Sequence, residues 1–394
     1  MSQPGKKILF LGHEASRTGA PLALLLLMRW LQENSAHRCE LFLKTGGELE
    51  AEYAAAVPTT NLETATRCNL PERLRGALTP RSQRWQEKIH RRVARLQPDL
   101  IYANTVALAN EVAACAGLNI PVLWNIHEGP FVQAEFNSWG QLDRALGAAD
   151  VFIAASAMVR DALVARGVPV EKIRVVYEFL QPAALATPDS AASRAALRRA
   201  AGWPEETFVV GMCGTASWVK GLDHFVATAR QIASEFPAKP IALAWLGKFI
   251  CDADERKIRY DLRKAGLESR VHFFLPRPDT AEFMAGLDVF FLSSREDVFP
   301  LAMLEAGAQG MPVVCFADSG GGPEFAGDDA GVVVPHSDTA AAARALASLQ
   351  ADPERRQRLG AAARQKSRTV YTIDTQAAKL AAVINEQLSK KICA

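Results

Sequence analysis

The sequence DVFPLAMLEAGAQGMPVV, residues 297–314, combines two acids with a run of small apolar residues. We expect a helix that begins near Pro300 or Leu301 in this stretch. Asp297 would then lie in the loop before the helix, and Glu305 about one turn inside it. The exposed amides at a helix N-terminus make an electropositive pocket. Carboxylates at the edge of such a pocket could accept hydrogen bonds from sugar hydroxyls.

A glycine-rich stretch, SGGGPEF at residues 319–325, follows soon after this helix. Its three glycines offer a second surface without side chains, which a ligand can approach closely. Two acids eight residues apart are weak evidence alone. The order of acid, Phe-Pro turn, acid, small-residue helix and Gly-Gly-Gly-Pro-Glu is improbable as coincidence, and it makes this stretch the most informative in the chain.

Outside this stretch, short β-rich apolar runs alternate with longer helical patterns, which predicts βαβ units and mainly parallel sheets. A chain of 394 residues is long enough for two domains. Residues 181–189, QPAALATPD, contain two prolines and no strand pattern, so we place the domain boundary there. The predicted strands are residues 7–11, 39–43, 100–103, 122–126, 151–154 and 173–176 in the first half, and 208–213, 241–246, 271–275, 289–292, 312–316 and 331–334 in the second.

Charge and cysteine content exclude several classes of protein. Lys and Arg number 45 against 43 for Asp and Glu, so no overall positive charge indicates a nucleic-acid partner. The seven cysteines are scattered without metal-ligand spacing, as in a reducing compartment. The apolar run at residues 8–11 is too short for a signal peptide, and residues 22–28 are too short to span a membrane. We expect a cytoplasmic protein.

Ligands of doubly wound sheets bind beyond the carboxyl ends of the strands, and three further loops there carry candidate residues. Residues 12–21, GHEASRTGAP, offer small residues and exposed amides to an anion, although a plain turn fits equally well. His127 in NIHEGP could hydrogen-bond or protonate a ligand, although such a histidine more often has a structural role. Lys220 in GTASWVKG precedes an amphipathic helix and could neutralise a departing diphosphate, although a solvated lysine is the commoner outcome.

Residues 297–314 together with 319–325 resemble the acid-x7-acid signature of the GT4 family of retaining glycosyltransferases. The motifs GTASWVKG, GHEASRTGAP and NIHE resemble that family too, in the correct order over nearly the whole chain. The resemblance implies an α/β protein of the GT-B fold, with two Rossmann-like domains facing across a cleft. It implies an acceptor-side domain at residues 1–180 and a nucleotide-sugar-binding domain at residues 181–374. A last helix at about residues 375–394 would pack back on the first domain.

The resemblance also implies roles for single residues. Asp297 matches the first acid of the signature, which faces the donor sugar, and Glu305 matches the acid that binds the ribose hydroxyls. His127 matches a histidine that contacts the donor sugar in the cleft. The remaining roles follow the same matches: amides around Phe299, Leu301 and Ala302 would hold the diphosphate together with Lys220, Gly19 and the adjacent Ala20 would close over it, and the backbone near Arg277 would meet the base.

Two positions depart from the family pattern. The first acid is usually Glu, whereas this sequence has Asp297, with Glu296 beside it. Many relatives carry an arginine that shares the phosphates with the lysine, and Thr215 stands in its place. The completeness of the phosphate-binding site is therefore in question. Its missing cation could come from Lys248, Arg277 or Arg295.

The reaction implied by the resemblance is transfer of a sugar from a UDP- or GDP-sugar to an acceptor hydroxyl with retention at the anomeric carbon. No cofactor is expected, and no acidic cluster resembles a metal site, so we expect catalysis without a divalent ion. The expected acceptor is a saccharide or a lipid-linked saccharide, in the synthesis of a bacterial surface polysaccharide. Two alternatives stay open, namely a sugar-nucleotide 2-epimerase of the same fold and a non-catalytic protein that binds sugar nucleotides.

A basic segment between Arg67 and Arg95 carries nine Lys and Arg residues and only two acids. Its apolar residues, Trp85, Ile89, Val93 and Leu96, share one face of a predicted helix. Such a segment can rest on an anionic membrane surface. An ordinary surface helix that packs this face on the sheet is an equally good interpretation.

Overall fold

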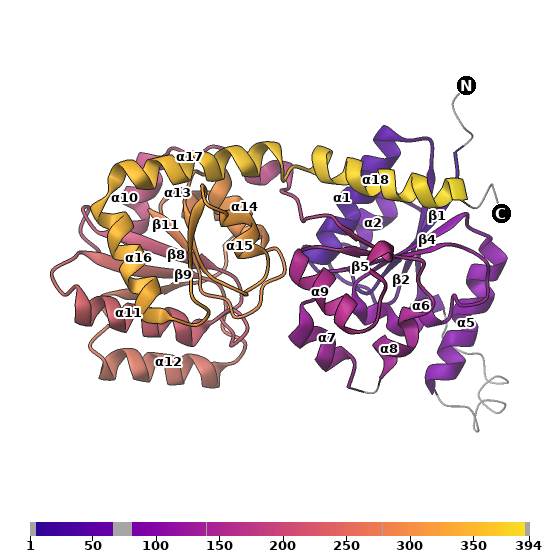
Figure 1. Ribbon diagram of the computed structural model, residues 1–394, viewed down its shortest axis with the longest axis horizontal. Coiled ribbons are helices and arrows are strands. Elements are labelled where there is room, and N and C mark those ends of the chain that lie inside the picture. The colour runs from indigo at the N-terminus through magenta and orange to yellow at the C-terminus, as the bar shows by residue number, and fades with distance from the viewer. Residues whose placement is uncertain (1–4, 66–80, 139, 278, 391–394) are drawn as a thin grey trace. The chain divides into compact units, whose positions relative to one another are not determined.

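The computed structural model describes residues 5–65, 81–138, 140–277 and 279–390, and the chain divides into two compact units. Unit 1 comprises residues 1–177 and 373–394, and unit 2 comprises residues 178–372. Figure 1 shows the strands of unit 1 together with the last helix of the chain, in yellow. Each unit is built on one sheet with helices packed against it.

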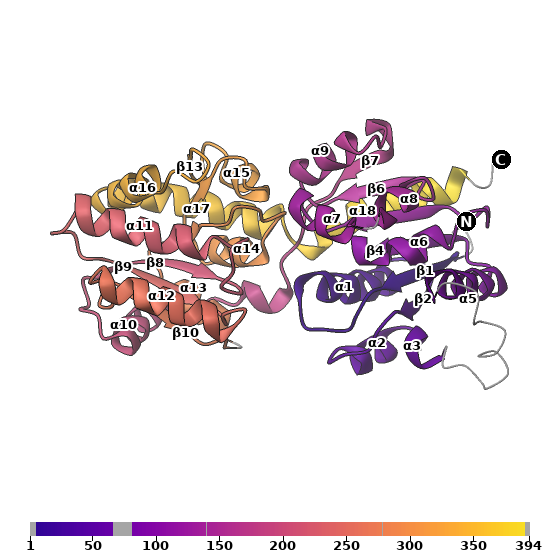
Figure 2. The same cartoon turned by 90° about the horizontal axis from the view of Figure 1, so that it is seen from below.

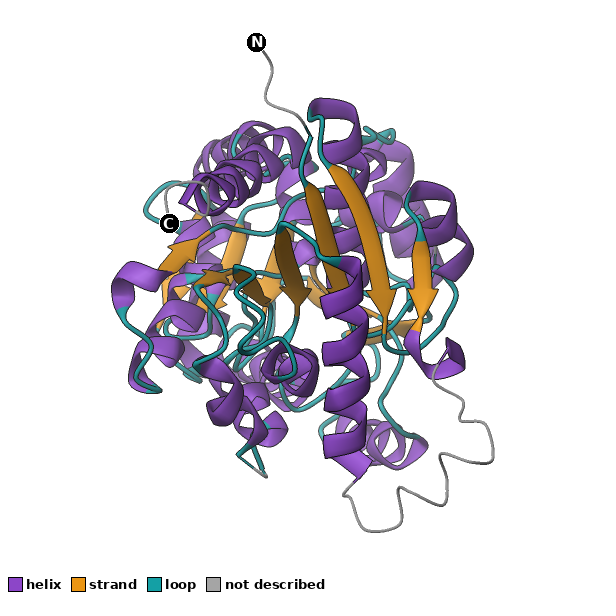
Figure 3. Cartoon of the chain, turned by 90° about the vertical axis from the view of Figure 1, so that its right-hand side faces the viewer, coloured by secondary structure: helices purple, strands orange, loops and turns teal. Residues whose placement is uncertain are grey.

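Unit 1 contains a seven-stranded parallel sheet in the order β3-β2-β1-β4-β5-β6-β7. Figure 3 looks onto this unit and shows the strands running side by side between helices. Its strands are β1 (Lys7–Gly12), β2 (Arg38–Leu43), β3 (Thr59–Asn61), β4 (Leu100–Asn104), β5 (Val122–Ile126), β6 (Val151–Ala154) and β7 (Ile173–Val175). Its helices are α1 (Gly19–Asn34), α2 (Glu50–Ala56), α3 (Leu62–Ala65), α5 (Arg81–Leu96), α6 (Ala109–Ala113), α7 (Pro130–Phe136), α8 (Gln141–Leu146), α9 (Ala157–Ala165) and α18 (Ile373–Lys390), with short 3-10 turns at Val106–Leu108 and Val170–Lys172.

Unit 2 contains a six-stranded parallel sheet in the order β10-β9-β8-β11-β12-β13. Its strands are β8 (Phe208–Cys213), β9 (Ile241–Leu246), β10 (Val271–Phe274), β11 (Val289–Leu292), β12 (Val313–Phe316) and β13 (Gly331–Val334). Its helices are α10 (Ser190–Ala201), α11 (Leu222–Glu235), α12 (Asp252–Lys264), α13 (Thr280–Ala285), α14 (Leu301–Ala308), α15 (Gly321–Ala326), α16 (Thr339–Ala351) and α17 (Pro353–Thr369), with a 3-10 turn at Pro182–Leu185. Helices α11 and α16 pack against each other (Figures 1 and 2).

Every strand predicted from the apolar runs is present, which confirms the α/β class and the parallel sheets. The inner strands β4, β5, β6, β9, β11 and β12 are buried on both faces, as parallel sheets covered by helices require. One further strand, β3 at Thr59–Asn61, was missed. It has three half-buried residues at the edge of the sheet, too few for a recognisable apolar run.

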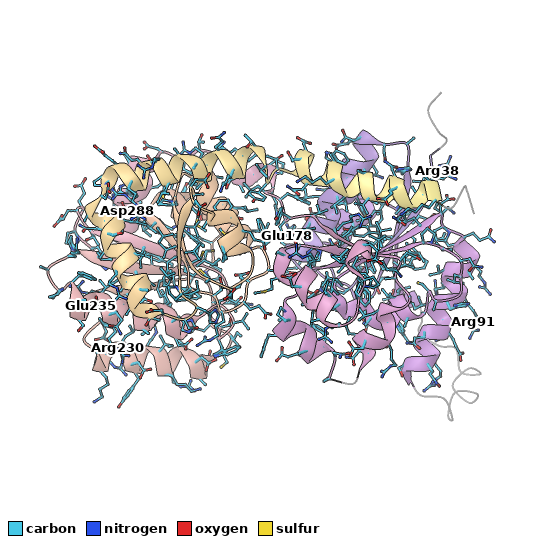
Figure 4. The ribbon with its side chains drawn as sticks, in the orientation of Figure 1. Arg38, Arg91, Glu178, Arg230, Glu235 and Asp288 are labelled. Carbon is cyan, nitrogen blue, oxygen red and sulfur yellow. The ribbon has the colours of Figure 1, made fainter. Side chains whose placement is uncertain are left out.

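A buried ion pair fixes the start of β11 in unit 2. Asp288, labelled in Figure 4, accepts a 2.7 Å bond from Arg198 and a 2.6 Å bond from Arg194, both on α10. The same carboxylate accepts the backbone N–H of Val209 on β8 at 2.8 Å. Because Arg198 and Asp288 are buried and satisfy each other, they hold α10, β8 and β11 together, whereas Arg194 is partly exposed.

Helix α18 belongs to unit 1, where it packs against α1 and β4. The indole N–H of Trp30 on α1 donates to Asp374 at 2.9 Å, and Arg174 pairs with Glu386 at 3.5 Å. The two connections between the units run side by side, because the N–H of Leu180 donates to the carbonyl of Tyr371 at 2.8 Å. Unit 1 is therefore assembled from two separate parts of the chain.

The apolar face of the basic segment is used inside unit 1. Ile89 and Val93 of α5 are fully buried, and the indole N–H of Trp85 donates to Glu111 of α6 at 2.5 Å. Arg91, labelled in Figure 4, and Arg95 are exposed. These contacts correspond to the surface-helix interpretation of this face. Residues 67–80 of the segment lie outside the described residues, and within the described ones no helix is long and apolar enough to cross a membrane.

Candidate functional site

The carboxyl ends of β8 and β11 bring two of the predicted site residues into contact in unit 2. Lys220 lies in the loop between β8 and α11, and Asp297 in the loop between β11 and α14. The Lys220 ammonium donates to Asp297 Oδ2 at 2.5 Å, and the Ser294 hydroxyl donates to the same oxygen at 3.1 Å. The Asp297 side chain is 10% exposed and that of Lys220 29%. The ammonium is thus held in place while part of it still reaches solvent.

Backbone contacts made by two glycines place these loops. A Cβ on Gly221 would lie 1.8 Å from the carbonyl oxygen of Ser293, and one on Gly320 would lie 2.0 Å from that of Asp297. Both glycines have positive φ, +68° and +107°. Around Gly320, the N–H of Asp297 donates to the backbone carbonyl of Ser319 at 2.8 Å, and the N–H of Gly321 donates to the backbone carbonyl of Asp297 at 3.0 Å. The loop of SGGGPEF is therefore fastened to the backbone of the first acid.

The second acid, Glu305, lies within α14 near the end of β8. Burial raises the pKa of Glu305 to about 7, and a hydrogen bond with Thr280 of α13 opposes this rise. Cys213, the last residue of β8, is close enough for Glu305 to affect it: burial, and secondarily Glu305, raise the pKa of its thiol to about 12. Near neutral pH a small change in surroundings therefore decides whether Glu305 is ionised.

Helix α14 begins at Leu301 with Pro300 as its N-cap residue, as the sequence predicts, and no side chain caps it. The amides of Leu301 and Ala302 belong to the first turn, where an α-helix offers N–H groups without an intrahelical acceptor. Phe299 is buried beside Tyr371, with ring centroids 5.0 Å apart. Its contacts fix the backbone that leads into the helix.

The residues considered as substitutes for the missing arginine have different surroundings. Arg295 donates to both carboxylate oxygens of Asp223 at 2.7 and 2.6 Å, and its guanidinium lies 4.6 Å from the ring of Trp218. Arg277 is paired with Asp279, and its guanidinium lowers the pKa of that carboxyl. Lys248 and Thr215 are exposed, after β9 and β8 respectively. Arg295 is tied to the Lys220 loop, because its N–H donates to Val219 at 2.9 Å.

In unit 1, the carboxyl ends of β4 and β5 bring His127 into a polar network. His127 Nε2 lies 2.7 Å from Asn104 Oδ1 and 2.9 Å from Asn125 Nδ2. Asn104 also donates to the carbonyl of Ala20, next to Gly19 in the first turn of α1. The network thus connects the predicted histidine with the loop of residues 12–21.

Sequence reasoning missed Asn104 and Asn125, although both carry a visible signal. Each is a polar residue within an otherwise apolar, buried strand. A buried amide needs hydrogen-bond partners, so its presence in such a strand indicates a defined polar contact. Two further groups interact with His127, and burial lowers the pKa of His13 and raises that of Glu128.

Comparisons with known proteins point to one family in both units. The model named Glycosyl transferases group 1 matches residues 193–366, and that named Glycosyltransferase Family 4 matches residues 18–183. A D-inositol 3-phosphate glycosyltransferase 1 from Catenulispora acidiphila is 29% identical over 56% of this chain and 53% of its own length. The chain spans about half the length of the curated relatives that it matches.

Solved structures share the fold over nearly the whole chain. Anabaena HepE in complex with UDP has a TM-score of 0.80 at 21% identity, covering 96% of this chain and 100% of HepE. The lipopolysaccharide outer core galactosyltransferase WaaB has a TM-score of 0.73 at 14% identity, covering 97% of this chain and 99% of WaaB. These similarities confirm the GT-B fold.

We predict that Gly320→Ala destabilises the protein far more than Gly117→Ala. At Gly320 the new Cβ would collide with the carbonyl oxygen of Asp297, whereas at Gly117 it would meet no atom of the described residues within 4 Å. Both glycines have positive φ, so Gly117→Ala shows what a side chain at positive φ costs without a collision. At Gly320, with φ +107° and ψ −137°, the strain of this glycine-favouring conformation adds to the collision. Urea denaturation of both variants measures the difference. Equal losses of unfolding free energy would contradict the proposed role of this contact.

We predict a pH-dependent part of the stability that Glu305→Gln removes. Between the ordinary pKa of about 4.5 and the folded value of about 7, the folded protein keeps a proton that the unfolded chain has released. The contribution of this carboxyl to the unfolding free energy therefore falls as the pH rises through this window, and it is constant above it. Denaturation curves at pH 5 and pH 8 should show a smaller decrease for the variant than for the native protein. An unchanged decrease would show that Glu305 titrates near its ordinary value.

Proposed function

Because the chain belongs to the GT4 family of GT-B glycosyltransferases, we propose that it transfers a sugar from a UDP- or GDP-sugar to an acceptor hydroxyl, with retention at the anomeric carbon. The observation that carries this proposal is the meeting of Lys220, Asp297 and the N-terminus of α14 in unit 2. A cation and unpaired amides are suited to a diphosphate, and carboxylates are suited to sugar hydroxyls. Anabaena HepE, which has the same fold, was solved with UDP bound.

The residues of unit 2 would stabilise the leaving group. In the proposed step the bond between the anomeric carbon and the diphosphate oxygen breaks, and the acceptor oxygen bonds to that carbon on the same face. The acceptor proton passes to the departing phosphate. Lys220 and the amides of Leu301 and Ala302 would neutralise the negative charge that develops there. With these donors the chemistry requires no divalent ion, and we propose that activity persists in the presence of a chelator.

The remaining donor contacts follow the same matches. Glu305 would bind the ribose hydroxyls and Asp297 the donor sugar, whereas His127 of unit 1 would contact that sugar near the reacting carbon. Arg295 is the best substitute for the missing arginine, because it is anchored to the Lys220 loop and its side chain is only 18% exposed. We propose a saccharide or lipid-linked saccharide as the acceptor, in the synthesis of a bacterial surface polysaccharide. WaaB, with the same fold, is a lipopolysaccharide galactosyltransferase.

A panel of UDP-, GDP- and ADP-sugars tests the donor by thermal shift, because a ligand that binds only the folded state raises its apparent stability. Release of nucleoside diphosphate in the presence of acceptor then identifies a transferase. Conversion of the donor to an epimer would identify a 2-epimerase instead. Saturable binding without either product would identify a binding protein. Failure of every sugar nucleotide to stabilise the protein would overturn the proposal.

We predict that Lys220→Ala and Glu305→Ala each weaken donor binding by roughly tenfold or more, because each removes a hydrogen-bonding group of the site. His127→Ala should lower kcat more than it weakens donor binding. Lys257→Ala is the control, since Lys257 is an exposed lysine of α12 outside the site. Titration of the donor and steady-state kinetics separate these effects. Full activity of all three site variants would show that the site has been assigned wrongly.

We propose a peripheral membrane contact through α5, carried by charge alone. Its apolar face is buried in unit 1, so Arg91 and Arg95 would attract anionic lipids without inserting a side chain. We predict that the protein sediments with vesicles of phosphatidylserine and phosphatidylcholine at low salt and is released at 0.5 M salt, because screening weakens charge attraction (at about 1 M the Debye length is only about 3 Å). Arg91→Glu with Arg95→Glu should abolish sedimentation. Binding that survives high salt would contradict a purely electrostatic contact.

A further inference from the structure

The orientation of the Asn104 amide in unit 1 is fixed by a backbone carbonyl. Its Nδ2 lies 3.0 Å from the carbonyl oxygen of Ala20, and a carbonyl oxygen can only accept a hydrogen bond. The other amide atom, Oδ1, therefore faces His127 Nε2 at 2.7 Å. Because Oδ1 carries no hydrogen, the hydrogen of this bond must be on Nε2.

The Asn125 amide conflicts with this assignment in the orientation that the structure has. Its Nδ2 lies 2.9 Å from the same Nε2 and 2.9 Å from the Tyr102 hydroxyl, so two hydrogen-bearing nitrogens would face each other. At the same time, Asn125 Oδ1 is buried and accepts no hydrogen bond from the described residues. Rotating this amide by half a turn removes the conflict at Nε2, because Oδ1 then accepts from His127 Nε2 and from the Tyr102 hydroxyl. The rotation gives up the 3.5 Å contact from Asn125 Nδ2 to Asn104 Oδ1, and Nδ2 takes the buried position of Oδ1.

We propose that Asn104 and Asn125 are positioning residues that hold neutral His127 as the tautomer with its hydrogen on Nε2. Two amide oxygens then accept the single Nε2 hydrogen, and the lone pair of the imidazole is on Nδ1. The hydrogen bonds made by one ring nitrogen thus set the chemistry of the other. This tautomer makes Nδ1 the ring atom that accepts a hydrogen bond from a sugar hydroxyl, a consequence that rests on the proposed function.

The network also gives α1 a part in this arrangement. The Ala20 carbonyl that orients Asn104 belongs to the first turn of α1, in the loop expected to contact the donor. Two titratable groups interact with His127, namely Glu128, which follows it, and His13 at the end of β1, and Lys44 at the end of β2 acts in turn on His13. Glu128 is itself occupied by the backbone N–H groups of Val106 and His127, each at 3.1 Å. At Nε2, the contacts among the described residues are those with the two amides.

Nitrogen NMR of the full chain, labelled with 15N in histidine, tests the tautomer without any substrate. His127→Gln identifies the His127 signals by their loss. At a pH where His127 is neutral, we expect a protonated Nε2 and an unprotonated Nδ1. A protonated Nδ1, or an equal mixture of the two tautomers, would overturn the proposal. Because no sugar nucleotide is present, this outcome is independent of whether the proposed transferase activity is found.

Two substitutions test which amides determine the tautomer. Asn125→Asp offers only oxygen acceptors and should keep the hydrogen on Nε2, whereas a tautomer switch in this variant would show that Asn125 donates. Asn104→Leu removes the anchored acceptor and should shift His127 toward a mixture of tautomers. In steady-state kinetics we expect Asn104→Leu to lower kcat by roughly tenfold or more with donor KM changed less than about twofold. Asn34→Leu, at the exposed end of α1, is the control and should leave kcat and donor KM unchanged. Equal loss in kcat and donor affinity for Asn104→Leu would indicate a structural role only.

Discussion

In unit 2, loops from three strands touch through their backbones, and the positions of the charged side chains depend on these contacts. Gly221 lies against the Ser293 carbonyl and Gly320 against that of Asp297, at distances that leave no room for a Cβ. The hydrogen bonds around Asp297 can form only because the glycine-rich loop brings its backbone so close to that of Asp297. The position of Lys220 follows from this geometry, since Lys220 precedes Gly221 and reaches the Asp297 carboxylate from the neighbouring loop. The glycines thus act by allowing close approach, while Lys220 and Asp297 carry the charge.

A consequence for the site is that its two acids have different surroundings. Asp297 has a cation and a hydroxyl as partners. Glu305 is buried with Thr280 as its partner, and its pKa rises to about 7. The two acids of one sequence signature therefore have different partners, which their spacing alone does not show.

Much of the fold could be predicted from the sequence because apolar runs and helix signals are local properties. The strands were recognisable from their short apolar runs, and α14 begins at Leu301, one of the two positions expected from the sequence. The edge strand β3 lacks such a pattern, since its three residues are only half-buried. Partners distant in sequence could not be predicted: nothing local to Arg295 indicates Asp223, 72 residues before it. The same holds for Asn104 and His127, which meet only because β4 and β5 are neighbours.

The division of unit 1 into two segments has a consequence for how the protein is made. Residues 1–177 leave the ribosome first, but α18 follows only after all of unit 2 has been synthesised. Domains generally fold as units during synthesis, and unit 2 is continuous, so it can reach its native state before unit 1 is complete. During that interval the surface of α1 that receives α18 stays uncovered, including the indole of Trp30. Unit 1, whose synthesis begins first, can therefore complete its structure only after all of unit 2 has been synthesised.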